Sequence, residues 1–210
     1  MQRREFLKIT LGAGVMALAN CGRVMAGRRR ERRPNIIFIM ADDMGWGDVA
    51  ANGSNEIVHT PNLDAMAAAG LRLTRCYATS PQCTPTRAGF LTGRHPTRNG
   101  CYGAGGNPLP TEATTIAEVL RDAGYATAVF GKWHLGDNHP CRPQDQGFDE
   151  VLMHGGGGVT QTPDFFGNDY FDDTYFRNGT TERRTGYCSR VWFDDGLKVV
   201  QATKQGSFFA

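Results

Sequence analysis

Cysteine, proline and arginine stand at two-residue steps in the stretch SPQCTPTRAGFLTGR (residues 80–94), as Cys83, Pro85 and Arg87. A cysteine in this setting can be a core residue, a thiol nucleophile, a metal ligand or the precursor of a modified group. The residues TRAGFLTG that follow it predict a short helix ending at Gly93. The chemistry open to Cys83 therefore depends on which other groups the fold brings to the start of that helix.

Charged side chains also follow two segments that we expect to be strands. The apolar run at residues 36–40 ends in Asp42 and Asp43, and residues 125–130 are followed by Lys132 and His134. In parallel α/β sheets, functional groups gather just past the carboxyl ends of the strands. Each group alone has an ordinary explanation as a solvated acid, a buried thiol or a surface cation. Their shared position at strand ends favours one common site that also holds Cys83 and Arg87.

The elements between these groups alternate in type. Residues 60–70 predict a helix with Leu63 and Met66 on its buried stripe, and the alternation in residues 71–78 predicts a strand. The order strand, helix, strand, helix, strand predicts an α/β fold with a mostly parallel sheet flanked by helices.

Later segments give local signals. Thr115 and Glu118 form a capping-box pattern at the start of a helix that we expect to end at Gly124. Asn178 and Gly179 predict the turn of a β-hairpin. We further expect a strand before a flexible glycine tract at residues 155–158, a helix over residues 189–202 and a strand in the final SFFA.

Positive charge is concentrated at the start of the chain. The formal net charge is +2, but the leader and the run RRRERR hold enough arginine that residues 34–210 are acidic on balance. An acidic body argues against a nucleic-acid-binding surface spread over the fold. We expect residues 27–33 to be a solvated basic tail.

The leader itself predicts export. Residues 1–26 combine the twin arginines Arg3 and Arg4 with a short apolar run and the small-residue pattern VMA. The apolar run is too short for a transmembrane span. We therefore expect a signal peptide read by a bacterial twin-arginine translocon, and a periplasmic or secreted protein. The sequence LANC, ending at Cys21, leaves lipidation as an alternative.

Six cysteines are scattered along the chain, and no two have C-x-x-C spacing. The sequence therefore gives no support for a zinc ribbon or a thioredoxin-type site, and it does not predict a disulfide framework.

The motifs PNIIFIMADDMGWGD, CTPTRAGFLTGR and GKWHLG resemble, in this order and spacing, the type I sulfatase family, whose catalytic domain is similar to alkaline phosphatase. The resemblance covers residues 34–210 and is strongest up to residue 136. It implies that a formylglycine-generating enzyme oxidises Cys83 to Cα-formylglycine, with Pro85 and Arg87 in the recognised segment. The implied activity is hydrolysis of aryl or carbohydrate sulfate esters, on a sulfated small molecule or polysaccharide.

The resemblance also implies roles for the clustered residues. Asp42, Asp43 and the modified Cys83 would bind Ca²⁺, for which oxygen ligands are suited. Arg87 would hold the modified residue near the metal. Lys132 would bind a sulfate oxygen, and His134 would hydrogen-bond the formylglycine hydroxyl.

Alternatives remain open at this stage. A phosphonate or phosphodiester hydrolase of the same superfamily can use the same modified residue. Because members of the family are longer, we also expect this chain to be an amino-terminal, incomplete portion of the catalytic domain, and an inactive or merely anion-binding fragment is a third reading. Asp137 and Asn138 come too early to be the missing metal ligands, and for His95 and His154 a helix-terminus or loop role is favoured over a pocket role.

Overall fold

The computed structural model describes residues 33–53, 57–105, 107–203 and 206–210. The chain divides into two compact units, Met1–Pro34 and Asn35–Ala210, and the account below concerns the second. The predicted signal peptide and, apart from Arg33, the predicted basic tail lie outside the described residues.

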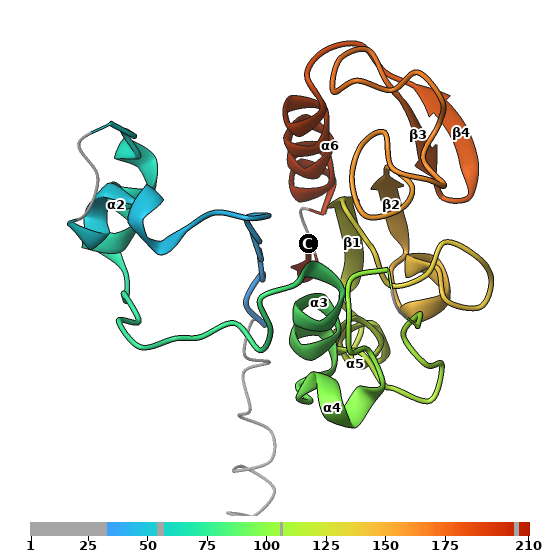
Figure 1. Ribbon diagram of the computed structural model, residues 1–210, viewed down its shortest axis with the longest axis horizontal. Helices are drawn as coiled ribbons and strands as arrows, with labels where there is room; N and C mark the ends of the chain where they lie inside the picture. Colours follow the sequence, from blue (N-terminus) through green and yellow to red (C-terminus); the bar gives the residue numbers. More distant parts are fainter. Residues whose placement is uncertain (1–32, 54–56, 106, 204–205) are drawn as a thin grey trace, which may run out of the picture. The chain divides into compact units, whose positions relative to one another are not determined.

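A five-stranded sheet with the order β4-β3-β2-β1-β5 organises the second unit (Figure 1). β1 is parallel to both β2 and β5, whereas β2 with β3 and β3 with β4 are antiparallel. The strands are β1 (Ala126–Gly131), β2 (Glu150–Met153), β3 (Thr174–Arg177), β4 (Thr180–Arg183) and β5 (Phe208–Phe209). The predicted parallel core is confirmed, and the sheet as a whole is mixed because a hairpin extends one side.

Helices and short 3-10 turns make up the rest of the regular structure. The helices are α2 (Pro61–Ala69), α3 (Cys83–Thr92), α4 (Pro96–Asn99), α5 (Ile116–Asp122) and α6 (Cys188–Ala202). The 3-10 turns are η1 (Trp46–Asp48), η2 (Ala50–Asn52) and η3 (Pro143–Gln146).

Successive side chains of the central strands enter two different cores. Val151 and Met153 of β2 pack in one cluster with residues of α3 and α5, while Leu152 between them packs in a second cluster with Val191 of α6. Because neighbouring residues of a strand point to opposite faces, the sheet is covered by helices on both faces. This confirms the predicted flanking helices.

The predicted helix cap and the predicted hairpin turn are both present. The Thr115 hydroxyl accepts a hydrogen bond from the Glu118 N–H at 3.1 Å, and the Glu118 carboxylate accepts one from the Thr115 N–H at 2.7 Å, which completes the capping box of α5. Asn178 and Gly179 both have positive φ, as a type I′ turn between β3 and β4 requires.

The strand expected at residues 36–40 is only partly formed. Ile36 makes a parallel bridge to Phe209, and the Phe38 N–H donates to the Ala210 carbonyl. Ile37, Phe38 and Ile39 remain exposed, at 59%, 41% and 61%. This run is apolar throughout, as is typical of a strand covered on both faces of a parallel sheet. It is not buried in that way here, because pairing with the two-residue β5 buries little of it.

Two further expectations between residues 60 and 78 are wrong. α2 begins and ends as predicted, at Pro61 and before Gly70, but its expected buried side chains Leu63 and Met66 are exposed at 39% and 63%. Residues 71–78 form no strand. The alternation of apolar residues marked a segment able to pair, but no described segment pairs with it.

Candidate active site

Cys83 is the first residue of α3. The preceding Gln82 has extended backbone, and Cys83 is half-buried while Pro85 is fully buried. Further along the helix, a Cβ on Gly89 would lie 2.5 Å from the Thr79 hydroxyl oxygen, so only glycine lets the incoming loop pack this closely. The loop and the helix together hold the sulfur at the helix N-terminus, where the free N–H groups favour negative charge.

Arg87 connects Cys83's helix to the end of β1. Its guanidinium donates a hydrogen bond to the Lys132 carbonyl at 2.6 Å and lies 3.8 Å from the Asp42 carboxylate. The Lys132 ammonium in turn lies 2.6 Å from the other oxygen of Asp42. One carboxylate is thus shared by two cations that come from different elements.

These three side chains differ in exposure. Those of Arg87 and Lys132 are only 13% and 8% exposed, while that of Asp42 is 43% exposed. Burial lowers the pKa of Arg87 from its ordinary value, and the nearby Asp42 and Cys83 oppose this shift. Because an arginine side chain stays protonated in proteins, two largely buried cations face a more open carboxylate. Such an arrangement attracts an anion from solvent.

His134 follows Lys132 by two residues and has left-handed backbone, with φ 58°. Its carbonyl accepts a hydrogen bond from the Thr84 hydroxyl at 3.1 Å, which connects it to the residue after Cys83. Burial lowers the pKa of His134, and the charges of Lys132 and Arg87 lower it further. The imidazole is therefore held neutral near pH 7.

Asp42 is positioned by the partly formed first strand. The Phe38 ring stacks on the Phe90 ring of α3, with centroids 3.7 Å apart, so the strand runs beside Cys83's helix before it delivers the two acids. Asp43 has left-handed backbone, with φ 60°, and an exposed side chain. Within the described residues, its carboxylate forms no ion pair or hydrogen bond with Cys83, Arg87 or Lys132.

The site fits part of a calcium shell. Ca²⁺ takes six to eight oxygen ligands, and Asp42 and Asp43 offer adjacent carboxylates of the right chemistry. In the described ranges, however, no group of three or more His, Cys, Asp or Glu side chains is placed to hold a metal ion. These residues could supply two of the ligands, and the rest of a shell would have to come from elsewhere.

The structure thus joins Asp42, Arg87 and Lys132 directly, places Cys83 on the helix of Arg87, and attaches His134 through Thr84. Asp43 lies beside this network without entering it. Sequence reasoning did not find Thr84, although its place beside Cys83 in the motif was a usable signal. His95 caps α4 and His154 is buried, as the helix-terminus and loop alternatives predicted.

A cavity of about 430 Å³ is lined in part by His134. Thr84, Asp137, Asn138 and Gly157 contribute to its lining. The site therefore has both a cationic edge, formed by Arg87 and Lys132, and a polar cavity beside His134.

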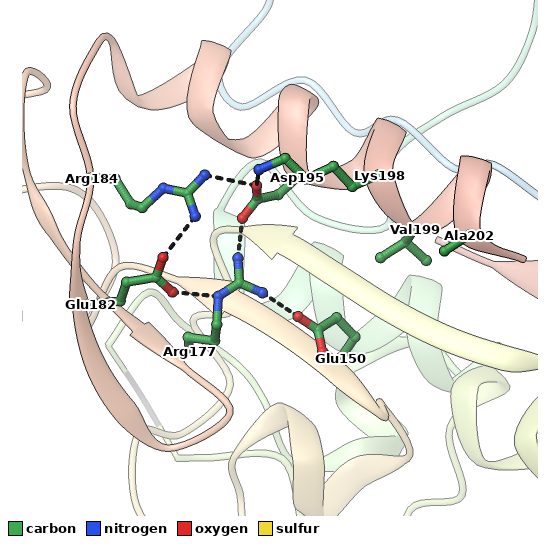
Figure 2. Close-up of a pocket in the computed structure, with 8 residues that line it drawn as sticks. All are labelled: Glu150, Arg177, Glu182, Arg184, Asp195, Lys198, Val199 and Ala202. Atoms are coloured by element: carbon green, nitrogen blue, oxygen red, sulfur yellow. Dashed lines mark hydrogen bonds and ion pairs between the residues drawn. The ribbon is translucent and has the colours of Figure 1, made fainter.

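A second cavity, of about 460 Å³, lies between the β3–β4 hairpin and α6 (Figure 2). Its charged side chains are already paired with one another: the Asp195 carboxylate accepts from Arg177, Arg184 and Lys198, and Glu182 bridges the two arginines. Three acids balance three bases in the lining, so this cluster ties the hairpin to α6 and offers no unpaired cation to a substrate.

The described cysteines are all free thiols: Cys76, Cys83, Cys101, Cys141 and Cys188. A disulfide framework was not expected, and the described part contains none. Among the described helices, none combines the length and the apolar character that a membrane crossing requires.

Residues 34–210 match the sequence profile of the family described as Sulfatase. The chain belongs to the sulfatase family. It is 48% identical to arylsulfatase G of Canis lupus familiaris over 130 residues, which are 59% of this chain and 24% of that protein. It is 44% identical to steryl-sulfatase of Homo sapiens over 133 residues, which are 59% of this chain and 22% of that protein.

Solved structures share the fold. Ps i-CgsB, in complex with k-i-k-neocarrahexaose, superposes with a TM-score of 0.75 at 30% identity, over 85% of this chain and 44% of that one. PsFucS1 sulfatase from Pseudoalteromonas sp. superposes with a TM-score of 0.65 at 27% identity, over 92% of this chain and 45% of that one. The chain spans about a quarter of the length of the curated relatives it matches.

Proposed function

We propose that this chain carries the nucleophile-bearing part of a sulfuric ester hydrolase that acts on aryl or carbohydrate sulfates. The observation that supports this most is the placement of Arg87 and Lys132, two largely buried cations that share the Asp42 carboxylate beside the helix that Cys83 begins. A sulfate ester is an anion whose oxygens gain charge as the ester oxygen leaves. Cations fixed before the substrate arrives stabilise that charge without having to reorganise.

We propose further that a formylglycine-generating enzyme converts Cys83 to Cα-formylglycine. Once hydrated, this aldehyde supplies a hydroxyl that attacks sulfur while the ester alcohol leaves, and a second hydroxyl through which sulfate is then expelled. The position of Cys83 suits this role because the first residue of α3 is half-buried and faces the charges of Arg87.

The surrounding residues would divide the remaining work. Lys132 would bind a sulfate oxygen with its ammonium, and Arg87, fixed by the Lys132 carbonyl, would hold the modified side chain in place. His134, kept neutral by burial and by the adjacent cations, can donate or accept one hydrogen bond at the modified residue.

Calcium is the metal that the oxygen donors favour. Asp42 and Asp43 would hold it, and bound Ca²⁺ would add positive charge against the sulfate oxygens. The ion pairs of Asp42 with Lys132 and Arg87 hold this carboxylate in a fixed orientation whether or not a metal is bound.

Mass spectrometry of the tryptic peptide from Cys76 to Arg87 tests the modification. Exchange of CH2–SH for CHO lowers the peptide mass by about 18 Da. A Cys83→Ala variant serves as the control for assignment. An unmodified thiol in protein purified from its native host would overturn the proposed nucleophile.

Turnover distinguishes the hydrolase classes. Nitrophenyl sulfate and the corresponding nitrophenyl phosphodiester would be compared on protein shown to carry the modification. We expect the sulfate ester to be preferred and Cys83→Ala to abolish turnover. Preference for the phosphodiester would favour the phosphonate or phosphodiester hydrolase reading instead.

We also propose that the protein is exported. The twin arginines at Arg3 and Arg4 and the following apolar run support a signal peptide at residues 1–26, read by a twin-arginine translocon. Replacement of both arginines by lysine should retain the precursor in the cytoplasm, measured by fractionation of the bacterial host. Unchanged export of that variant would contradict the proposal.

A further inference from the structure

The glycine tract at residues 155–158 packs against the imidazole of His134. A Cβ on Gly157 would lie 2.5 Å from Nε2 and 2.6 Å from Cε1 of this ring. Separations under 3.0 Å do not occur between a real Cβ and its neighbours, so any side chain at position 157 must displace the imidazole. The backbone of Gly157 is not left-handed. Its need for glycine comes from close packing, mainly on the imidazole and also on the Gln161 side-chain oxygen, which a Cβ would approach to 2.9 Å.

Two carboxylates hold the first half of the tract. The Gly156 N–H donates to the Asp137 carboxylate at 2.9 Å, and the Gly155 N–H donates to the Asp164 carboxylate at 3.1 Å. Asp137 is three residues beyond His134, so one short segment carries the imidazole and also the acceptor that fixes the tract against it. The first two of the four glycines are therefore anchored by hydrogen bonds, and the third packs against the His134 ring.

The conformation of His134 must be maintained by packing of this kind. Its backbone is left-handed, a strained conformation for a non-glycine residue that the surroundings must maintain. Its Nδ1 is buried and has no hydrogen-bond partner in the described part of the chain. A ring with one edge against Gly157 and the other nitrogen unsatisfied is in place to receive a ligand atom at Nδ1.

We propose that Gly157, anchored through Gly156 and Asp137, is a positioning residue that fixes the His134 imidazole and leaves Nδ1 as the nitrogen that bonds the reacting group. This inference rests on the proposed function for its catalytic meaning, since His134 acts there at the modified Cys83. The claim that Gly157 fixes the position of the imidazole does not depend on turnover and can be tested without it.

Gly157→Ala and Gly158→Ala form a matched pair of tests. Neither glycine has left-handed backbone. A Cβ at either position would meet the Gln161 side-chain amide, which can move, at 2.9 Å from Gly157 and 3.1 Å from Gly158, but only a Cβ on Gly157 would also meet the imidazole. The readout is the set of ring ¹⁵N and ¹³C signals of His134 in the labelled chain at pH 8, where the ring is neutral because its pKa lies below the ordinary value of 6.5.

We expect Gly157→Ala to shift or broaden the His134 ring signals and Gly158→Ala to leave them in place. The signals of His59, His95 and His139 report whether each variant is folded. Equal responses of His134 to the two substitutions, or no response to either, would overturn the proposal.

A second pair of variants tests the proposal if the Gly157→Ala protein does not fold. Asp137→Ala removes the acceptor of the Gly156 N–H, whereas Asp137→Asn keeps an oxygen that can accept it. We expect the alanine variant alone to move the His134 ring signals, and unchanged signals in both variants would count against the anchor.

On protein with measurable sulfatase turnover, Gly157→Ala should lower kcat by about 100-fold with little change in KM, because a displacement of about 1 Å at a reacting group costs that much. Wild-type protein without turnover would count against the proposed function. Unmoved His134 signals would count against the positioning role, so the two failures are distinguishable.

Discussion

The carboxylate of Asp42 and the ammonium of Lys132 lie 2.6 Å apart although ninety residues separate them in the sequence. One follows the partly formed first strand and the other follows β1. Their ion pair connects the first strand to the end of β1. Arg87 connects α3 to the same strand end by donating a hydrogen bond to the Lys132 carbonyl. Lys132 therefore has two roles, since its backbone positions Arg87 and its side chain supplies charge.

Replacement of Lys132 by alanine tests the second of these roles. Lys132→Ala leaves the carbonyl that fixes Arg87 and removes the side chain beyond Cβ with its ammonium, so we expect kcat for nitrophenyl sulfate to fall by about 10²- to 10³-fold. Lys198→Ala is the control, because this lysine is 64% exposed and belongs to the charged cluster at α6. Similar kcat values for the two variants would show that the Lys132 charge does not serve the reaction.

The sequence predicted features whose cause is local. The capping box at Thr115 needs only residues three apart, and the hairpin turn at Asn178 needs only the left-handed preference of two adjacent residues. The strand that delivers Lys132 was likewise predicted, at residues 125–130. In each case the signal and the structure lie within one segment of the chain.

Predictions that depended on distant partners were less secure. The alternation in residues 71–78 could not reveal whether a neighbouring strand exists, and the apolar side chains of α2 could not reveal what covers them. The packing of Gly157 on His134 was invisible for the same reason, because four glycines in a row do not specify what they approach. Motif residue types indicated the chemistry, but the fold had to supply the contacts.

Two adjacent acids on α6 should differ greatly in their effect on stability. The Asp195 side chain is 3% exposed and accepts from Arg177, Arg184 and Lys198, as Figure 2 shows. Asp195→Ala leaves the two arginines short of a partner, and we expect it to lower the free energy of unfolding by about 3–5 kcal/mol.

Asp194→Ala is the matched control, because Asp194 is 45% exposed and, among the residues that the structure describes, its ion pair is with Arg190 one turn away. A surface pair of this kind contributes about 0.3–0.5 kcal/mol. Urea denaturation of both variants gives the comparison. A loss for Asp195→Ala no larger than that for Asp194→Ala would mean that the cluster does not stabilise the fold.

Gly147 and Gly53 separate backbone strain from close packing. Both have left-handed backbone, with φ 103° and 79°, but a Cβ at Gly147 would lie 2.4 Å from the Glu118 backbone nitrogen, while a Cβ at Gly53 would meet nothing within 4 Å. Gly53→Ala should cost about 1–2 kcal/mol from strain alone. Gly147→Ala should cost about 1–3 kcal/mol more, because the start of α5 must move. Equal urea midpoints for the two variants would rule out the close contact with α5.

Asp145 should contribute stability that depends on pH. Hydrogen bonds from the Arg142 guanidinium lower its pKa from 3.8 to about 2. Because the folded state holds the carboxylate ionised below its unfolded pKa, this contribution is present above about pH 4 and is lost as the pH falls towards 2. Other paired carboxylates titrate in the same range, so the informative quantity is the difference between variants.

The urea midpoint of the wild type should therefore fall more steeply between pH 4 and pH 2 than that of Asp145→Asn. Arg142→Gln removes the main cause of the shift while leaving the carboxylate, and it should flatten the same part of the curve. The differences among the three proteins should shrink as the pH falls towards 2, where Asp145 is almost fully protonated in the unfolded state and about half protonated in the folded wild type. Parallel curves across this range would mean that the Arg142 pair does not hold the carboxylate ionised in the folded protein.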